Sequence, residues 1–269
     1  MAPYIRLIAP PGRHHAPHRA PSNHRPTHLA LCKPSTRQPR PPTHYRISPT
    51  NLVAFHLEIE RKFAPTATSM QQLASNTGTP PFKSPIHYGT TNLEDSYYDT
   101  VDEVLCNAGV WLRRRGNKWE AKVRVGGDLT NSTSEEITDV EDISTMLGKL
   151  VLGAAIDPRE GLLCGRVKGV AQLVCRRNKF LADRKVTVVL DETDFGHVVG
   201  EVELQRDIPF AGGEDHANGA ERKDQKKEQV VAEMDREIDN FMKRYVWAFP
   251  PGKPVGKLSA YFALKKQRQ

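Results

Sequence analysis

Apolar and polar residues alternate along much of the chain from Leu52 onward, and this period of two predicts β-strands. Apolar residues recur at helical spacing in two places, one containing Ile143 and Leu147 and the other containing Met234 and Ile238. We therefore expect a sheet that carries two surface helices. The clearest predicted strands are 53–63, 110–116, 118–126, 184–192 and 198–206.

Two segments show neither period. Residues 212–229 are polar, and we interpret them as a loop leading into the second helix. Residues 1–50 contain 11 of the 20 prolines and six of the ten histidines. Such a segment cannot bury enough apolar surface to offset its ordering entropy. We expect 1–50 to be a disordered Pro/Arg/His-rich tail and 51–269 to form one folded domain.

The positive charge is concentrated in the tail. Of the 39 Lys and Arg residues, eight precede Glu58, which leaves 31 against 32 acidic residues in the remainder. A nucleic-acid-binding domain would keep its basic excess on the folded surface, so we expect no nucleic-acid partner. No stretch reaches the roughly 18 to 20 apolar residues that a membrane span needs, so we expect no membrane partner.

Localisation and assembly follow from weaker signals. The four cysteines form no C-x-x-C pair and indicate free thiols in a reducing compartment. We expect a cytoplasmic monomer. The acid-free, Arg-rich start is also typical of a mitochondrial transit peptide, although its prolines oppose the helix that such a peptide needs. An uninformative tail or a wrongly assigned start is the other alternative.

Charge lies on one face of each predicted strand. Glu58, Glu60 and Lys62 share a face, because side chains alternate along a strand. The other face carries Leu57, Ile59, Arg61 and Phe63. A solvated edge strand explains this pattern when it is taken alone. The pattern recurs, however, at Arg113 with Arg115, at Glu120 with Lys122, and at Glu201 with Glu203.

If the apolar faces pack against helices, the charged faces converge inside a closed barrel. Mixed charge is costly to bury unless a ligand compensates it. A polyanion bridged to the carboxylates by a divalent cation would do so, and the guanidinium fork of arginine suits phosphate. We therefore expect Mg²⁺, with Mn²⁺ as the alternative, and a phosphate-rich small molecule.

The pentad of residues 58–62 matches the E-x-E-x-K signature of the CYTH superfamily, the triphosphate tunnel metalloenzymes. Within this superfamily the chain is most similar to the thiamine triphosphatases, through YYDT and the W-L-R-R-R…W-E-x-K arrangement. Further blocks follow in the family's order: SYYDT (96–100), WLRRRGNKWEAK (111–122), EEIT (135–138), LVCRRNKF (173–180), VLDETDFG (189–196), VGEVEL (199–204) and GKLSAY (256–261).

The resemblance implies an α+β fold, an eight-stranded antiparallel β-barrel with surface helices. It implies Mg²⁺-dependent hydrolysis of thiamine triphosphate to thiamine diphosphate and phosphate. Hydrolysis of inorganic tripolyphosphate or of another organic or nucleoside triphosphate is the alternative within this fold, and a non-enzymatic polyphosphate binder is the third class.

The resemblance also implies residue roles. Lys62 and Tyr97 would activate water, and Trp111 would stack on the thiazolium ring. The residues expected at the substrate are Arg113, Arg115, Lys122, Glu136, Arg177 and Lys257, and those expected at the metal are Glu58, Glu60, Asp191, Glu201 and Glu203.

Two departures from the family's pattern bear on these roles. Arg176 and Arg177 are adjacent and have opposite parity, and we choose Arg177 because Phe180 then falls where the family places an aromatic residue three positions later. Val189 stands where thiamine triphosphatases often carry an acid, so only Asp191 remains of an alternating pair. Trp111 has the parity of Arg113, which places it on the charged inner face, where a cationic ring would explain its presence. For Trp119 and Trp247 we predict packing roles.

Overall fold

Strands that are apolar on one face must bury that face against a second layer, and here the second layer is helical. The computed structural model describes residues 52–211 and 219–268, which belong to one compact unit. Its elements are β1 (Leu52–Phe63), α1 (Ala67–Ser75), β2 (Ile86–Asp99), α2 (Val104–Asn107), β3 (Val110–Arg115), β4 (Lys118–Gly127), β5 (Asn131–Ile137), α3 (Val140–Leu150), β6 (Ala155–Ile156), β7 (Leu163–Cys164), β8 (Lys168–Ala182), β9 (Val186–Thr193), β10 (Val198–Ala211), α4 (Gly219–Arg244) and α5 (Lys257–Gln267).

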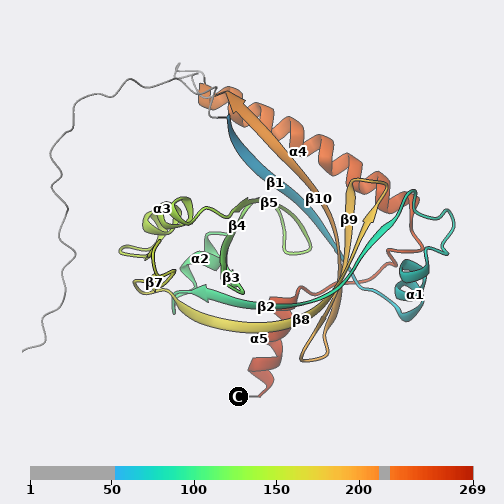
Figure 1. The fold of residues 1–269 in the computed structure, drawn as a ribbon, viewed down its shortest axis with the longest axis horizontal. Coiled ribbons are helices and arrows are strands. Elements are labelled where there is room, and N and C mark those ends of the chain that lie inside the picture. The colour runs from blue at the N-terminus through green and yellow to red at the C-terminus, as the bar shows by residue number, and fades with distance from the viewer. Residues whose placement is uncertain (1–51, 212–218, 269) are drawn as a thin grey trace, which may run out of the picture. The chain divides into compact units, whose positions relative to one another are not determined.

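Eight strands close into an antiparallel barrel in the order β1-β10-β9-β8-β2-β3-β4-β5, and β6 pairs separately with β7 (Figure 1). The predicted eight-stranded barrel is therefore confirmed. The predicted strand boundaries hold to within a few residues, except that β10 runs on to Ala211. The turn into β9 uses Asp183 and Arg184, both in the left-handed backbone region.

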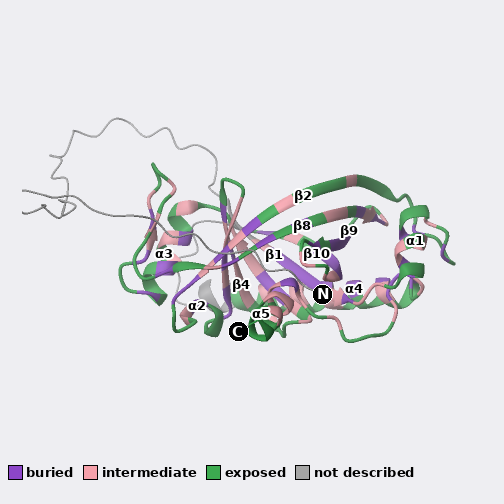
Figure 2. Ribbon diagram, turned by 90° about the horizontal axis from the view of Figure 1, so that it is seen from below, coloured by how far each residue is buried: buried purple, intermediate pink, exposed green. Residues whose placement is uncertain are grey.

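The apolar faces of the strands point outward. Leu57 and Ile59 of β1 are fully buried, and they belong to one core with Met234 and Ile238 of α4, which lies along β1 and β10 (Figure 1). In the view coloured by burial, purple marks these covered parts of the sheet, whereas parts of β2 and β8 are exposed (Figure 2). The barrel is thus apolar outside and leaves its charged faces to the inside.

A second core lies over β3 and β4. Leu112 and Ala121 pack there with Ile143 and Leu147 of α3, and Trp119 belongs to the same core. Trp247 packs, partly buried, against the first core. The packing roles predicted for the two tryptophans are confirmed.

The predicted loop at 212–229 is wrong over its second half, because α4 already begins at Gly219. Residues 219–229 are rich in Lys, Glu and Gln, which are strong helix formers, but they lack the apolar stripe from which a helix is recognised. No pattern in the sequence indicated α5 either. Its Leu258 and Tyr261 pack against a buried cluster that includes Tyr97 and Leu173 of the barrel.

The predicted disordered tail of residues 1–50 and its transit-peptide alternative lie outside the described residues. In the part of the chain that the structure describes, no helix is long and apolar enough to cross a membrane. Cys106, Cys164 and Cys175 are free thiols, as expected.

Candidate active site inside the barrel

The barrel encloses a cavity of about 310 Å³, a size that suits a small ligand. Every residue predicted for the site lines this cavity except Asp191. The lining members of the predicted set are Glu58, Glu60, Lys62, Tyr97, Trp111, Arg113, Arg115, Lys122, Glu136, Arg177, Glu201, Glu203 and Lys257.

Strand register brings the charged residues of β1 and β10 together. Glu60 pairs with Glu203 and Lys62 pairs with Glu201. Directly paired residues project from the same face of a sheet, so alternate positions on the two strands build one wall of the cavity.

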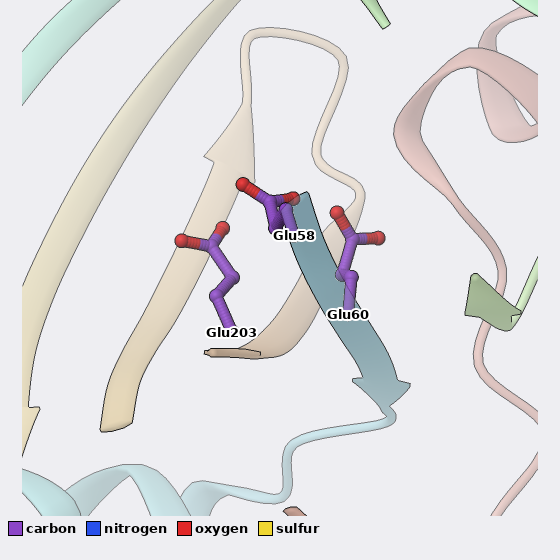
Figure 3. A group of neighbouring side chains, drawn as sticks. All are labelled: Glu58, Glu60 and Glu203. Carbon is purple, nitrogen blue, oxygen red and sulfur yellow. The ribbon is translucent and has the colours of Figure 1, made fainter. Parts of the chain in front are cut away.

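Three buried carboxylates gather on this wall. Glu58 and Glu60 project from β1 and Glu203 projects from β10, and one oxygen of each lies within 4.8 Å of the others (Figure 3). Burial, with the nearby charge of Glu58, raises the pKa of Glu203 to about 8. The negative charge of neighbouring carboxylates opposes the ionisation of a buried acid, and a cation bound beside them would offset that charge.

Lys122 supplies part of that charge. Its ammonium pairs with Glu58 and lies 3.2 Å from Glu60 and 3.7 Å from Glu136. Although burial opposes ionisation, Lys122 outweighs it and lowers the pKa of Glu58. Burial, reinforced by Glu58, raises the pKa of Glu136.

The other two predicted metal ligands lie in a different cluster. Arg177 donates to both oxygens of Asp191 at 2.7 Å, and Lys257 pairs with Asp191 and donates to Glu201 at 2.7 Å. Despite burial, Lys257 and the cations around it lower the pKa of Glu201 well below its usual value. Asp191 and Glu201 are not part of the three-carboxylate group, and their part in metal binding stays a prediction.

Two further arginines are held in the same manner. Arg115 donates to both oxygens of Asp95 at 2.7 Å, and Arg113 donates to Glu120 at 2.7 Å. The contacts of Arg115 and Arg177 with both oxygens of a carboxylate fix the planes of these two guanidinium groups, whereas Arg113 contacts a single oxygen of Glu120. The N–H groups that remain can serve an anion in the cavity.

Lys62 and Tyr97 are the two residues expected to activate water, and no hydrogen bond joins their side chains among the described residues. Among the described residues, the ammonium of Lys62 pairs with Glu60. Tyr97 lies instead within the electrostatic reach of Arg113 and Lys257. Both side chains line the cavity, on different parts of its wall.

Trp111 lines the cavity as its parity predicts. The guanidinium carbon of Arg124 stands 5.5 Å from the centre of its ring, so a cation already stacks on the indole.

Several lining residues were missed. Gln205 donates to Glu58 at 2.8 Å, and Lys179 and Glu120 also line the cavity. Gln205 follows Glu203 by two positions and Lys179 follows Arg177 by two, so extending the parity rule along each strand would have found both. Leu258 and Ser259 come from α5, for which the sequence carried no signal.

The three-carboxylate group suits a divalent metal. Hard cations such as Mg²⁺ prefer oxygen ligands, and Glu58, Glu60 and Glu203 offer three carboxylates. Ser134 pairs with Glu58 across β1 and β5, and its buried hydroxyl oxygen has no hydrogen-bond partner among the described residues. A hydrated cation beside these groups would satisfy both the acids and the hydroxyl.

Comparisons with known proteins agree with this arrangement. The model of the CYTH domain family matches residues 56–229. Thiamine-triphosphatase of Homo sapiens is 33% identical over 174 residues, and the match covers 58% of this chain and 72% of that protein. Thiamine-triphosphatase of Macaca fascicularis is 32% identical over 179 residues, with the same two shares covered.

Solved structures show a more distant likeness. A protein from Hippeastrum, described as having a dominant triphosphatase activity, is 16% identical with a TM-score of 0.44, over 77% of this chain and 95% of that one. A Pyrococcus horikoshii protein is 16% identical with a TM-score of 0.39, over 77% of this chain and 99% of that one.

Proposed function

Because this chain belongs to the CYTH domain family, we propose that it is a hydrolase of acid anhydrides that converts thiamine triphosphate to thiamine diphosphate and phosphate with Mg²⁺. The observation that carries the proposal is the cavity, in which buried carboxylates and oriented basic side chains share one enclosed surface. A site for a simple polyanion would gain nothing from the acids, whereas a site for a metal-bound triphosphate needs both groups. The similarity to thiamine-triphosphatases supports the choice of substrate.

Glu58, Glu60 and Glu203 would hold the metal. A bound Mg²⁺ supplies positive charge to the phosphate oxygens and so offsets the charge that builds up during phosphoryl transfer. In this proposal, the protein's own side chains bind the phosphate groups and position the attacking water.

Arg113, Arg115 and Arg177 bind phosphate oxygens in this proposal, together with Lys257. Because each arginine is fixed by a carboxylate, the donors need little reorganisation when charge develops on the leaving diphosphate. Lys122 neutralises the carboxylate wall against the incoming anion.

Lys62 and Tyr97 are the proposed catalytic residues. The ammonium of Lys62, held at Glu60, can donate to the attacking water or to the terminal phosphate. The hydroxyl of Tyr97, on β2 across the barrel from β1, can position water near Arg113 and Lys257.

One observation favours the second candidate, inorganic tripolyphosphate. The stacking of Arg124 on Trp111 gives the indole a partner without any thiazolium ring. A substrate that lacks an organic group would leave that contact undisturbed.

The deciding experiment measures phosphate release from thiamine triphosphate, tripolyphosphate and ATP side by side, with and without Mg²⁺. We expect thiamine triphosphate to be the best substrate. Far faster turnover of tripolyphosphate would assign the second function, and no turnover of any of the three would leave a binding protein.

Trp111→Ala separates the two substrates further. We expect it to raise KM for thiamine triphosphate about 10-fold, as the loss of a desolvated cation–π contact implies, and to leave KM for tripolyphosphate nearly unchanged. Leu129→Ala is the matched control, because Leu129 is an exposed apolar residue that also lines the cavity. Equal effects of Trp111→Ala on both substrates would assign Trp111 to packing.

A further inference from the structure

Two aspartates project into the barrel interior beneath the basic residues of the cavity, and contact those residues there. Asp191 is fully buried and Asp95 is 2% exposed, and neither lines the cavity. Each accepts a two-pronged hydrogen bond from a cavity arginine, Asp191 from Arg177 and Asp95 from Arg115, with all four distances at 2.7 Å.

The two pairs arise from the same strand geometry. Arg177 on β8 is the direct register partner of Asp191 on β9, and Arg115 on β3 is the direct partner of Asp95 on β2. In each pair the acid is the more buried member. The arginine lines the cavity, so the N–H groups that the acid does not bind are available to a ligand there.

Asp191 has a second basic partner. The ammonium of Lys257, at the start of α5, pairs with one of its oxygens. A single buried carboxylate therefore fixes two cations that come from distant parts of the chain. Both of its oxygens accept bonds from these cations, and it is not part of the group formed by Glu58, Glu60 and Glu203.

We propose that Asp95 and Asp191 are positioning residues, which orient Arg115, Arg177 and Lys257 for phosphate and bind neither the metal nor the substrate. This inference rests on the proposed function, because it assigns phosphate to the oriented cations. A guanidinium left without its carboxylate would keep its charge but lose its fixed plane, and the two-point contact with phosphate depends on that plane.

The experiment compares Asp191→Asn with Glu203→Gln in two measurements. The first is the Kd for Mn²⁺ in the substrate-free protein, from electron paramagnetic resonance titration. The second is KM and kcat with whichever triphosphate the wild type hydrolyses best. We expect Asp191→Asn to leave the Kd for Mn²⁺ within about 2-fold and to lower kcat/KM about 10 to 100-fold, whereas Glu203→Gln weakens Mn²⁺ binding by more than about 10-fold.

Glu192→Gln is the matched control. Glu192 is the next residue on β9 and pairs with Arg176, the next residue before Arg177 on β8, on the exposed outer face. The substitution Glu192→Gln removes an ion pair from the same two strands. We expect it to change neither the Kd for Mn²⁺ nor kcat/KM. Asp95→Asn tests the second pair independently, and we expect it to behave as Asp191→Asn does.

Removing one member of a buried ion pair can also unfold a protein. If Asp191→Asn does not fold, the double variant Asp191→Asn with Arg177→Met removes both charges, and we expect it to fold and to bind Mn²⁺ with the wild-type Kd. Weakening of Mn²⁺ binding in either variant as severe as in Glu203→Gln would make Asp191 a metal ligand and overturn the proposal. So would unchanged kcat/KM in a folded Asp191→Asn protein.

Failure of the proposed function would look different. If the wild type hydrolyses no triphosphate, calorimetric binding of inorganic tripolyphosphate to the metal-free protein replaces the kinetic measurement. Asp191→Asn should then weaken that binding about 10-fold, and unchanged binding would overturn the positioning role.

Discussion

Glu203 shows how burial and neighbouring carboxylates oppose ionisation in the site. Its carboxyl is buried beside Glu58 and Glu60, and its pKa is raised from 4.5 to about 8. The folded protein therefore binds a proton that the unfolded chain releases between these two pH values. Its contribution to stability falls as the pH rises through this window, because stability is lost wherever the folded state binds more protons.

Glu203→Gln should accordingly stabilise the metal-free protein at pH 8.5, by more than about 1 kcal/mol, since one pKa unit corresponds to about 1.4 kcal/mol. At pH 4.5 the two proteins should differ little. The same substitution should reduce the stabilisation that we expect Mg²⁺ to give to the wild type, because it removes one of the proposed ligands. Thermal denaturation with EDTA and with Mg²⁺ at both pH values measures all of these effects.

Glu192→Gln serves as the control, since its side chain is exposed and lies outside the carboxylate group. A Glu203→Gln protein no more stable than the wild type at pH 8.5 in EDTA would contradict the electrostatic account.

Parity made most of the site residues predictable. Side chains at alternate positions must share a face, so the sequence alone sufficed to assign the charges at Glu58, Glu201 and Arg113 to one interior. Which acid pairs with which base was not predictable, because pairing depends on strand register. The pairing of Asp191 with Arg177, for example, follows from the register of β8 and β9 and could not be predicted.

At the scale of elements, Gly200 of β10 shows how two strands fit together. It is the register partner of Phe63, and a Cβ at this position would come within 2.1 Å of the Phe63 ring. That ring is 3% exposed and makes an edge contact with Phe249, with ring centres 5.1 Å apart. The aromatic ring therefore occupies the space that an alanine side chain would need.

Gly200→Ala should lower the free energy of unfolding by about 2 kcal/mol, as overpacking of a filled core does. Urea unfolding of the metal-free protein measures the change. Gly126→Ala is the matched control on β4, because the nearest atom to its added Cβ, on Thr133, lies at an ordinary contact distance of 3.7 Å. Equal effects of the two substitutions would show that Phe63 can move aside.

A helix could be predicted from the sequence where its apolar residues recur at helical spacing. Such a period marks α3, whose Ile143 and Leu147 are buried. It marks only the second half of α4, since the residues after Gly219 have strong helix propensity but no apolar face. It is weak in α5, where Leu258 and Tyr261 are the packed residues and basic residues follow closely.

For the molecule as a whole, α5 both covers part of the barrel and supplies a basic residue to its cavity. Its first residue, Lys257, reaches Asp191 and Glu201, while Leu258 and Tyr261 cover a cluster that contains Cys175. Burial, with the nearby charge of Asp191, raises the pKa of the Cys175 thiol to about 11. Two features therefore make the Cys175 thiol unreactive toward thiol reagents: the residues that cover it and its small thiolate fraction.

Deleting residues 257–269 should remove both Lys257, the cation that we propose binds phosphate, and the cover over Cys175. We expect kcat/KM to fall further than in Lys257→Met, which loses only the cation, and Cys175 to react with a thiol reagent much faster than in the full chain. Mass spectrometry of the labelled peptides follows Cys175 separately, with the exposed Cys106 and Cys164 as internal standards of reagent access. If deletion and Lys257→Met lost the same activity and Cys175 stayed unreactive in both, α5 would contribute its lysine alone and the barrel would remain closed without it.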